Sequence, residues 1–295
     1  MHRVEAQIER LIQEINYDEV SRLFSMLSGG KRLRAKLVLK IANEHEDAPL
    51  LAAIVELIHG ASLLHDDVID EAMTRRGKAS VNATEGSKTA VMLGDILYSK
   101  AFTELVHFDK LVAQTISASV TDLSKGEMMD VKMAESFNSD EKKYLDMLYL
   151  KTATLIEAAA KASAILAGKN AATHALYGRN LGLSFQIIDD ILDITSDEAT
   201  LGKPAMNDFV EGKCTLPYIY LYHALDEQDK HRLVSSHAKE ISSEESAWIK
   251  ENMQKYNTIE KSFELALKLS NEAQEAMAED PELVAILETM IKRSY

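Results

Sequence analysis

Two short aspartate-rich segments carry the clearest chemical signal in the sequence. Residues 66–70 read Asp-Asp-Val-Ile-Asp, residues 189–193 read Asp-Asp-Ile-Leu-Asp, and each segment follows an apolar stretch. On an α-helix, residues four apart lie on one face a turn apart, so the first and last aspartate of each segment project together. Carboxylates at that spacing repel one another unless a cation lies between them. The spacing therefore predicts two carboxylate sites for a divalent cation.

Magnesium is the cation that suits such sites best. It prefers oxygen ligands, keeps several waters, and usually binds through one or two carboxylates together with substrate phosphates. An acidic pair on a helix is ordinarily a solvated surface, and either segment alone would be read that way. Two copies of one pattern, each after an apolar stretch, favour metal-assisted phosphate binding.

Basic residues stand close to both aspartate segments in the chain. Residues 29–34 read Gly-Gly-Lys-Arg-Leu-Arg, residues 75–78 read Arg-Arg-Gly-Lys after the first segment, and Lys203 and Lys213 follow the second. Basic runs are usually solvated surface, so their placement beside both segments is what favours phosphate binding. The sequence predicts two diphosphates, one held through metal and one held directly by arginine and lysine.

Helices are predicted to position all of these groups. The 295 residues include only 4 prolines and 12 glycines, and no proline lies between Pro49 and Pro204. Proline interrupts helices and sheets alike, whereas the abundant Ala, Leu, Glu, Lys and Met are good helix formers. Apolar side chains recur at helical spacing in residues 4–15, 50–64, 144–160 and 259–277. No hairpin signal appears, and we expect one all-α domain over residues 1–295.

Two further features of the chain are predicted locally. Ser139 or Asp140 is expected to cap a helix that runs to a stop near Gly168. Residues 195–217 carry two prolines and two glycines and are expected to form a long loop, which is often functional at such a length.

The composition excludes several classes of protein. Lys and Arg number 33 against 47 Asp and Glu, giving a net charge of −14 that argues against a nucleic-acid partner. The single cysteine, Cys214, excludes a disulfide framework and a multi-cysteine metal site. The amino terminus lacks the apolar stretch of a signal peptide, and no run of about 18 uncharged apolar residues is present, so we expect a cytoplasmic protein without a membrane span.

Together these motifs resemble those of the trans-type polyprenyl diphosphate synthases, most closely the bacterial octaprenyl (long-chain) type. The matching stretches, in chain order, are GGKRLR (29–34), LLHDDVID (63–70), RRGK (75–78), GD (94–95), KGE (125–127), KTA (151–153), FQIIDDILD (185–193), GKP (202–204) and GKCTLP (212–217). The resemblance implies an all-α bundle around a deep central cavity, a homodimer, and three Mg²⁺ ions per active site when substrate is bound.

The resemblance also assigns roles to individual residues. Asp66, Asp70 and Asp189 would be the principal metal ligands, supported by Asp67, Asp190 and Asp193. The allylic diphosphate would be held by Arg75, Lys151, Lys203 and Lys213. Isopentenyl diphosphate would be held by Lys31, Arg34, His59 and Arg76. Thr152 and Gln186 would stabilise the developing allylic cation through their oxygen dipoles, which makes Lys151, Thr152, Gln186 and Lys203 the expected catalytic residues.

The implied reaction condenses an allylic diphosphate, such as farnesyl diphosphate, with successive isopentenyl diphosphates, head to tail. Mg²⁺ neutralises the leaving diphosphate as a Lewis acid, and water has to be excluded from the allylic cation. The alkene of isopentenyl diphosphate attacks the cation, and a proton is lost to the departed diphosphate. No protein nucleophile is needed, in line with the lack of any convincing Ser-His-Asp or Cys-His arrangement in the sequence.

Product length is expected to depend on the residues five and four before Asp66. In the polyprenyl diphosphate synthases the residues at these two positions decide whether the growing prenyl chain can pass between the helices. Here they are the small residues Ala61 and Ser62. An open channel favours a product of about C30 to C40 or longer, and we expect octaprenyl (C40) for a quinone side chain. Bulkier side chains must form the floor, and the candidates are Met92, Phe102, Met129 and Met133. Asp130 stands where long-chain members carry glutamine and short-chain members often carry an acid, so this motif leaves product length open.

Four alternatives are weighed against this assignment. The nearest is a short-chain synthase making farnesyl or geranylgeranyl diphosphate (C15–C20). A class I terpene cyclase normally has an Asn/Ser/Glu motif in place of residues 189–193. A non-catalytic subunit of a heteromeric synthase usually loses one aspartate segment, and this chain keeps both. A helical di-iron bundle needs Glu-x-x-His pairs on facing helices, which we do not find in the sequence.

Overall fold

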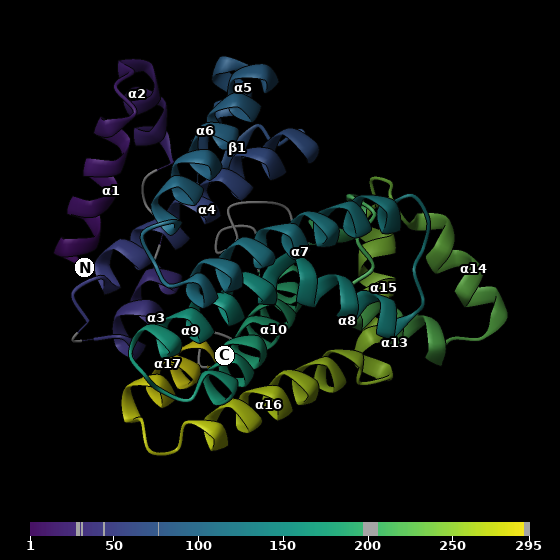
Figure 1. The fold of residues 1–295 in the computed structure, drawn as a ribbon. Helices are drawn as coiled ribbons and strands as arrows, with labels where there is room; N and C mark the ends of the chain where they lie inside the picture. Colours follow the sequence, from purple (N-terminus) through teal and green to yellow (C-terminus); the bar gives the residue numbers. More distant parts are fainter. Residues whose placement is uncertain (28–29, 31, 44, 76, 197–205, 292–295) are drawn as a thin grey trace. The chain divides into compact units, whose positions relative to one another are not determined.

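The computed structural model describes residues 1–27, 30, 32–43, 45–75, 77–196 and 206–291. Over these ranges the chain is built almost entirely of helices, so the predicted all-α fold is confirmed (Figure 1). The chain groups into two compact units. The first unit comprises Met1–Val120 and Glu157–Ala175, and the second comprises Thr121–Ile156 and Leu176–Tyr295. Three helices contribute residues to both units, and the single domain over residues 1–295 stays a prediction.

The longer stretch of the first unit runs from the amino-terminal helices into helix α7. Its elements are α1 (His2–Glu14), α2 (Asp18–Met26), α3 (Leu33–Ile41), α4 (Ala48–Ile69), β1 (Thr74–Arg75), β2 (Lys78–Ala79), α5 (Val81–Glu85) and α6 (Ser87–Leu105). The helices shared by both units are α7 (Lys110–Ala134), α9 (Thr154–Leu166) and α10 (Ala171–Thr195).

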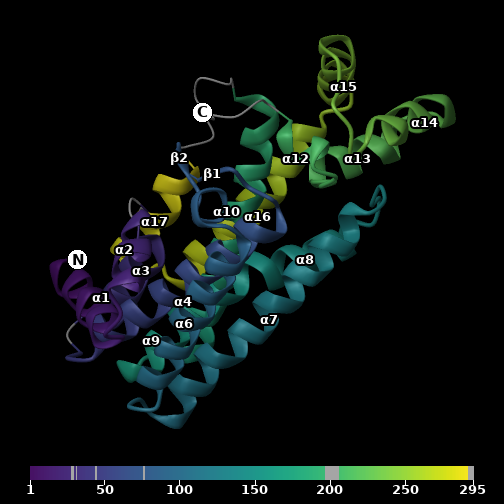
Figure 2. The same ribbon diagram turned by 90° about the horizontal axis from the view of Figure 1, so that it is seen from above.

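Helix α4 forms the core of the first unit. Pro49 lies in its first turn, where the missing N–H costs nothing, and no later proline interrupts it. It packs chiefly against α6, which lies beside it, and also against α1 and α3 (Figure 2). By length and composition alone α4 could cross a membrane, but 72% of its most apolar window is buried inside the protein. Such burial is typical of the central helix of a globular core.

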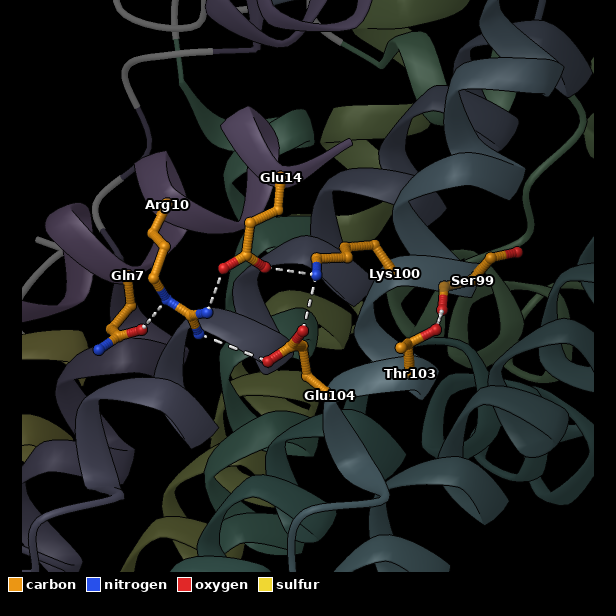
Figure 3. A network of polar contacts seen from close by, with 7 residues as sticks. All are labelled: Gln7, Arg10, Glu14, Ser99, Lys100, Thr103 and Glu104. Carbon is orange, nitrogen blue, oxygen red and sulfur yellow. Dashed lines mark hydrogen bonds and ion pairs between the residues drawn. The ribbon is translucent and has the colours of Figure 1, made fainter. Parts of the chain in front are cut away.

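A network of four charged side chains joins α1 to α6 (Figure 3). Lys100 donates to Glu14 and to Glu104, both at 2.7 Å. Arg10 donates to Glu14 at 2.5 Å and to Glu104 at 3.4 Å. The side chain of Glu104 is only 8% exposed, whereas that of Glu14 is 40% exposed. Because Glu104 is the less hydrated carboxylate, the network depends mainly on it.

A small β-hairpin follows α4, although the sequence shows no hairpin signal. Thr74 of β1 pairs with Ala79 of β2, and Arg75 pairs with Lys78, in antiparallel register. Gly77 lies in the turn with φ of +74°, a conformation that glycine adopts without steric cost. Strands of two residues are too short to produce an alternating apolar pattern, which explains why the sequence carries no hairpin signal there.

The second unit contains the remaining helices. They are α8 (Glu141–Leu148), the π-helix η1 (Tyr149–Ala153), α12 (Asn207–Val210), α13 (Leu216–Ala224), α14 (Glu227–Ser236), α15 (Ser243–Lys255), α16 (Thr258–Ala276) and α17 (Pro281–Ile291). Helix α13 packs against α15 and α16. Two apolar clusters form its core, one around Ile187 and Ile219 and one around Phe209 and Leu233.

The predicted helix from residue 140 to Gly168 is present but is not uniform. The Asp140 side chain accepts a hydrogen bond from the N–H of Lys143, and Gly168 ends the helical stretch with φ of +65°. Both predicted ends are therefore confirmed. Between them, the N–H of Thr154 donates to the carbonyl of Tyr149, five residues earlier, as in a π-helix. Such widened turns are frequent at functional sites.

The predicted loop over residues 195–217 is partly helical. The short α12 lies inside it, and α13 already begins at Leu216 with Pro217 in its first turn. Residues 197–205 of this stretch, which include Lys203, lie outside the described residues.

The charged network between α1 and α6 generates a stability prediction. We expect Glu104→Gln to lower the free energy of unfolding by about 2 kcal/mol, because it leaves partly buried Lys100 with one carboxylate in place of two. The matched control Glu14→Gln, at an exposed position of the same network, should cost less than about 1 kcal/mol. Urea unfolding followed by circular dichroism measures both, and equal losses would contradict the assigned importance of Glu104.

Candidate functional site

The first aspartate segment lies at the carboxyl end of α4. The helix ends at Ile69, and the N–H of Asp70 still donates to the carbonyl of Asp66 at 2.8 Å. Asp70 is exposed and Asp66 half-buried, so both carboxylates reach solvent. The side chain of Asp67 is only 2% exposed, and Arg75 donates to its Oδ1 from Nε at 2.7 Å and from a terminal nitrogen at 2.6 Å. Asp67 is therefore engaged by the β1 arginine.

Helix α6 approaches α4 closely and positions His65, the residue directly before the first aspartate segment. A Cβ atom on Gly94 would lie 2.3 Å from the His65 ring, so only glycine leaves room there. The ring nitrogen Nε2 of His65 lies 3.2 Å from the carbonyl of Val91 and 3.4 Å from the carboxylate of Asp95. The glycine-aspartate pair at 94–95 thus positions His65 and, through it, the end of α4.

Arg34 and His59 are brought together in the first unit. The Arg34 guanidinium lies 3.2 Å from Nε2 of His59. The preceding Arg32 has φ of +51° and is held by Glu56 at 3.1 Å, while Glu56 also accepts the N–H of Ala35 at 3.0 Å. Buried Glu56 therefore fixes the start of α3 that presents Arg34. The predicted partners Lys31 and Arg76 lie outside the described residues.

The two residues expected to control product length are buried on α4. Ala61 is fully buried and Ser62 is 5% exposed, with its hydroxyl donating to the carbonyl of His59 at 2.9 Å. Among the floor candidates, Met92 and Phe102 are exposed on α6, Met133 is buried, and Met129 packs against the first apolar cluster of the second unit. Exposure does not favour Met92 or Phe102 as the floor of an internal channel.

In the second unit, Lys151 lies on the π-helical turn between two acids. Its ammonium lies 2.9 Å from Glu127 and 2.5 Å from Asp130, both nearly buried on α7. A Cβ atom on Gly126 would lie 2.2 Å from the backbone nitrogen of Lys151, so glycine is required for α7 to approach this turn. Asp130, where glutamine was expected, thus supplies a second counter-charge to Lys151.

Asp190, the middle acid of the second segment, is held by neutral donors. It is 5% exposed, and it accepts hydrogen bonds from the hydroxyl of Tyr144 and from Nε2 of Gln186 at 3.0 Å. Burial raises the pKa of Asp190 well above its usual range, and the nearby carboxylate of Asp208 raises it further. The hydrogen bonds from Tyr144 and Gln186 oppose that rise.

The last acid of the second segment, Asp193, is bound to backbone. Its Oδ2 accepts the N–H of Asp208 at 3.1 Å, so the start of α12 is tied to the end of α10. The first acid, Asp189, is half-buried and less enclosed than Asp190 and Asp193.

The segment carrying Lys213 is anchored on both sides. Gly212 has φ of +89°, and a Cβ atom there would lie 2.8 Å from the carbonyl oxygen of Ala134. Nε2 of buried His237 lies 2.7 Å from the carbonyl of Gly212, and burial lowers the pKa of His237. Lys213 is therefore presented from a fixed backbone.

A cavity of about 130 Å³ in the second unit gathers these groups. Its polar lining includes Asp130, Tyr144, Lys151, Thr152, Gln186, Asp190, Asp208, Lys213 and Thr215. Met133, Met147, Leu148 and Cys214 supply apolar walls, and burial raises the pKa of the Cys214 thiol to about 12, which marks it as an inert small side chain. Tyr144 and Asp208 belong to this lining, and no pattern in the sequence marks them as site residues, because only the fold brings them to residues 186–190.

The carboxylates suit a metal ion whose coordination shell is completed by substrate. Within the described ranges, no three His, Cys, Asp or Glu side chains gather closely enough to hold a metal ion. Magnesium, however, needs only one or two carboxylates when substrate phosphates and waters complete its shell. Asp66, Asp70 and Asp189 expose oxygens of that kind, so the residues present fit magnesium.

Comparison with known proteins places the chain in a family. Residues 18–256 match the model of the polyprenyl synthetase family. The chain is 38% identical over 243 residues to the short chain isoprenyl diphosphate synthase of Methanothermobacter thermautotrophicus, covering 78% of this chain and 75% of the relative.

Solved structures agree with the match in sequence. The octaprenyl pyrophosphate synthase of Helicobacter pylori superposes with a TM-score of 0.93 at 44% identity, covering 99% of this chain and 97% of that one. A polyprenyl synthase of Caulobacter crescentus, complexed with calcium and isoprenyl diphosphate, superposes with a TM-score of 0.86 at 29% identity, covering 99% and 94%. The resemblance seen in the motifs is thereby confirmed, and the chain belongs to the polyprenyl synthetase family, a class of prenyltransferases with the all-α isoprenoid synthase fold.

Proposed function

We propose that the protein condenses an allylic diphosphate with successive isopentenyl diphosphates to give a long trans-polyprenyl diphosphate. The observation that carries the proposal is the division among the six aspartates of the two segments. Asp67, Asp190 and Asp193 are buried, whereas Asp66 and Asp189 are half-buried and Asp70 is exposed. Carboxylates that keep some contact with solvent suit a diphosphate bound through Mg²⁺, because the ion needs only one or two of them when phosphates and waters complete its coordination.

The chain's cations are proposed to hold the two diphosphates. Arg75, Lys151 and Lys213, with Lys203, would hold the allylic diphosphate. Arg34 and His59, with Lys31 and Arg76, would hold isopentenyl diphosphate. Bound Mg²⁺ would supply Lewis-acid neutralisation of the leaving diphosphate.

Thr152 and Gln186 are proposed to act on the allylic carbon. Both line the cavity beside Lys151, and the Thr152 hydroxyl donates to Oε1 of Gln186 at 3.3 Å. Oxygen dipoles fixed in this way stabilise a developing cation without having to reorganise during the reaction. The apolar wall of Met133, Met147 and Leu148 would limit the access of water to the cation.

The product is proposed to be octaprenyl diphosphate, for a quinone side chain. The support is the pair of small residues Ala61 and Ser62, together with the likeness to the octaprenyl synthase of H. pylori. A short-chain product of about C15–C20 is the alternative, supported by the likeness to a short chain synthase.

The protein is also proposed to form a homodimer in the cytoplasm. Apolar side chains are exposed along one stripe of α6, namely Val91, Met92, Phe102 and the following Val106, at 37%, 57%, 36% and 74%. A second copy of the chain would cover this stripe.

We expect light scattering to give twice the mass of one chain, and the double variant Met92→Lys, Phe102→Glu to give half that mass. A single-chain mass for the unsubstituted protein would contradict the dimer.

Activity of the purified chain tests the function directly. With farnesyl diphosphate, radiolabelled isopentenyl diphosphate and Mg²⁺, we expect label in a long polyprenyl product. Chelation by EDTA should abolish turnover, and added Mg²⁺ should restore it. Turnover that survives chelation would refute the metal-assisted mechanism, and a chain that is folded but inactive alone would favour the non-catalytic subunit.

Product length is tested on α4. Ala61→Tyr and Ser62→Phe should each shorten the product to about C15–C20, because an aromatic ring would fill the proposed channel. The matched control Ser62→Ala removes the hydroxyl without adding volume and should leave product length unchanged. Chromatography of the dephosphorylated products measures chain length, and unchanged length in both aromatic variants would refute the channel assignment.

A further inference from the structure

Gln186 can serve the proposed reaction only if its amide is turned in one direction. Nitrogen and oxygen of an amide are nearly isosteric, so hydrogen bonds decide which way the group points. Here Nε2 donates to Asp190 at 3.0 Å and Oε1 accepts from Thr152 at 3.3 Å. The opposite orientation would place an oxygen against a carboxylate and the amide nitrogen against Thr152. Asp190 is thus the group that orients Gln186.

Asp190 itself must be held in place. It is buried, and it accepts hydrogen bonds from two neutral donors, the hydroxyl of Tyr144 and the amide of Gln186. The carboxylates of Asp189 and Asp208 lie close enough to repel it. Tyr144 is the donor that comes from outside α10, so it fixes the carboxylate in space while Gln186 follows it.

Tyr144 is built into the core from which it reaches Asp190. It is 2% exposed on α8 and packs in the apolar cluster that contains Ile187 and Ile191 of α10. Tyr144 also lines the cavity, together with Thr152 and Gln186. Close packing on all sides restrains the ring, so the position of its hydroxyl is well defined.

We propose that Tyr144 is a positioning residue, which holds Asp190 so that Gln186 presents its oxygen to Thr152 and the cavity. This role deepens the proposed function, and the expected effect on the reaction rate rests on that function. The orientation of Gln186 can be measured without any turnover. Tyr144 does not touch substrate in this scheme and acts through two hydrogen bonds in series.

The principal test is Tyr144→Phe, with Tyr177→Phe as its matched control. Tyr177 is equally buried in the second unit, and its hydroxyl donates to the backbone carbonyl of Leu283 at 2.9 Å, away from the cavity. Each variant loses one buried hydroxyl, so both should lose comparable stability. Only Tyr144→Phe should slow the chemical step, by about ten- to a hundredfold in single-turnover condensation, with KM for both substrates within about twofold.

A double-mutant cycle tests the route through Gln186. Gln186→Leu removes the amide, so adding Tyr144→Phe to it should slow the reaction by less than about twofold further. Multiplicative losses would show that Tyr144 acts by another route and would overturn the proposal.

Crystal structures separate this inference from the proposed function. In Tyr144→Phe, Asp190 should turn from Gln186 and their contact should lengthen beyond about 3.5 Å, whereas in Tyr177→Phe it should remain. An unchanged contact in Tyr144→Phe would overturn the positioning role, whatever the activity. An inactive unsubstituted protein would refute the proposed function, and the Asp190–Gln186 contact would still decide the role of Tyr144.

Discussion

Repulsion between carboxylates is the constraint on which the candidate site depends. Like charges close together in a partly dehydrated site must be balanced, neutralised or spread apart. The chain balances its buried acids one by one: Arg75 engages Asp67, Lys151 engages Glu127 and Asp130, and backbone N–H engages Asp193. Asp190 is held by two neutral donors, Tyr144 and Gln186. The carboxylates left accessible, at positions 66, 70 and 189, are those that a cation can approach.

Two glycines let neighbouring helices approach the turn that carries Lys151, which brings its ammonium to the buried acids. Gly126 lets α7 lie against the backbone of Lys151, and Gly182 lets α10 lie against Ala153 on the same π-helical turn. Added methyl groups would lie 2.2 Å and 2.6 Å from those backbones, so neither glycine can be replaced without moving the turn. The π-helix that presents Lys151 and Thr152 therefore packs against two helices, and each of them contributes a glycine at the contact.

Local signals in the sequence predicted the all-α class, several helices and a few of their ends, but not the features that need tertiary contact. The Asp140 cap and the Gly168 stop depend on a few neighbouring residues and were predictable. The π-helical turn has no local signature, because packing against Gly126 and Gly182 distinguishes it from an α-turn. Tyr144 and Asp190 are 46 positions apart, and a tyrosine in an apolar helical stripe reads as core. The spacing of the aspartates predicted carboxylates on one face of each helix. Which of these carboxylates are buried depends on the hydrogen-bond donors that the tertiary structure places beside them.

The position of Lys151 bears on how the site would handle diphosphate. An ammonium between two carboxylates brings no net positive charge, so it attracts an anion less strongly than an unpaired lysine would. With glutamine at position 130 the same lysine would face one acid, and the local charge would be more positive by one unit. If Lys151 binds the allylic diphosphate as proposed, Asp130 weakens that attraction and favours release of the diphosphate after each condensation. An enzyme that repeats its reaction on one growing chain must release that group every cycle, so the acid at position 130 is compatible with a long product as well as a short one.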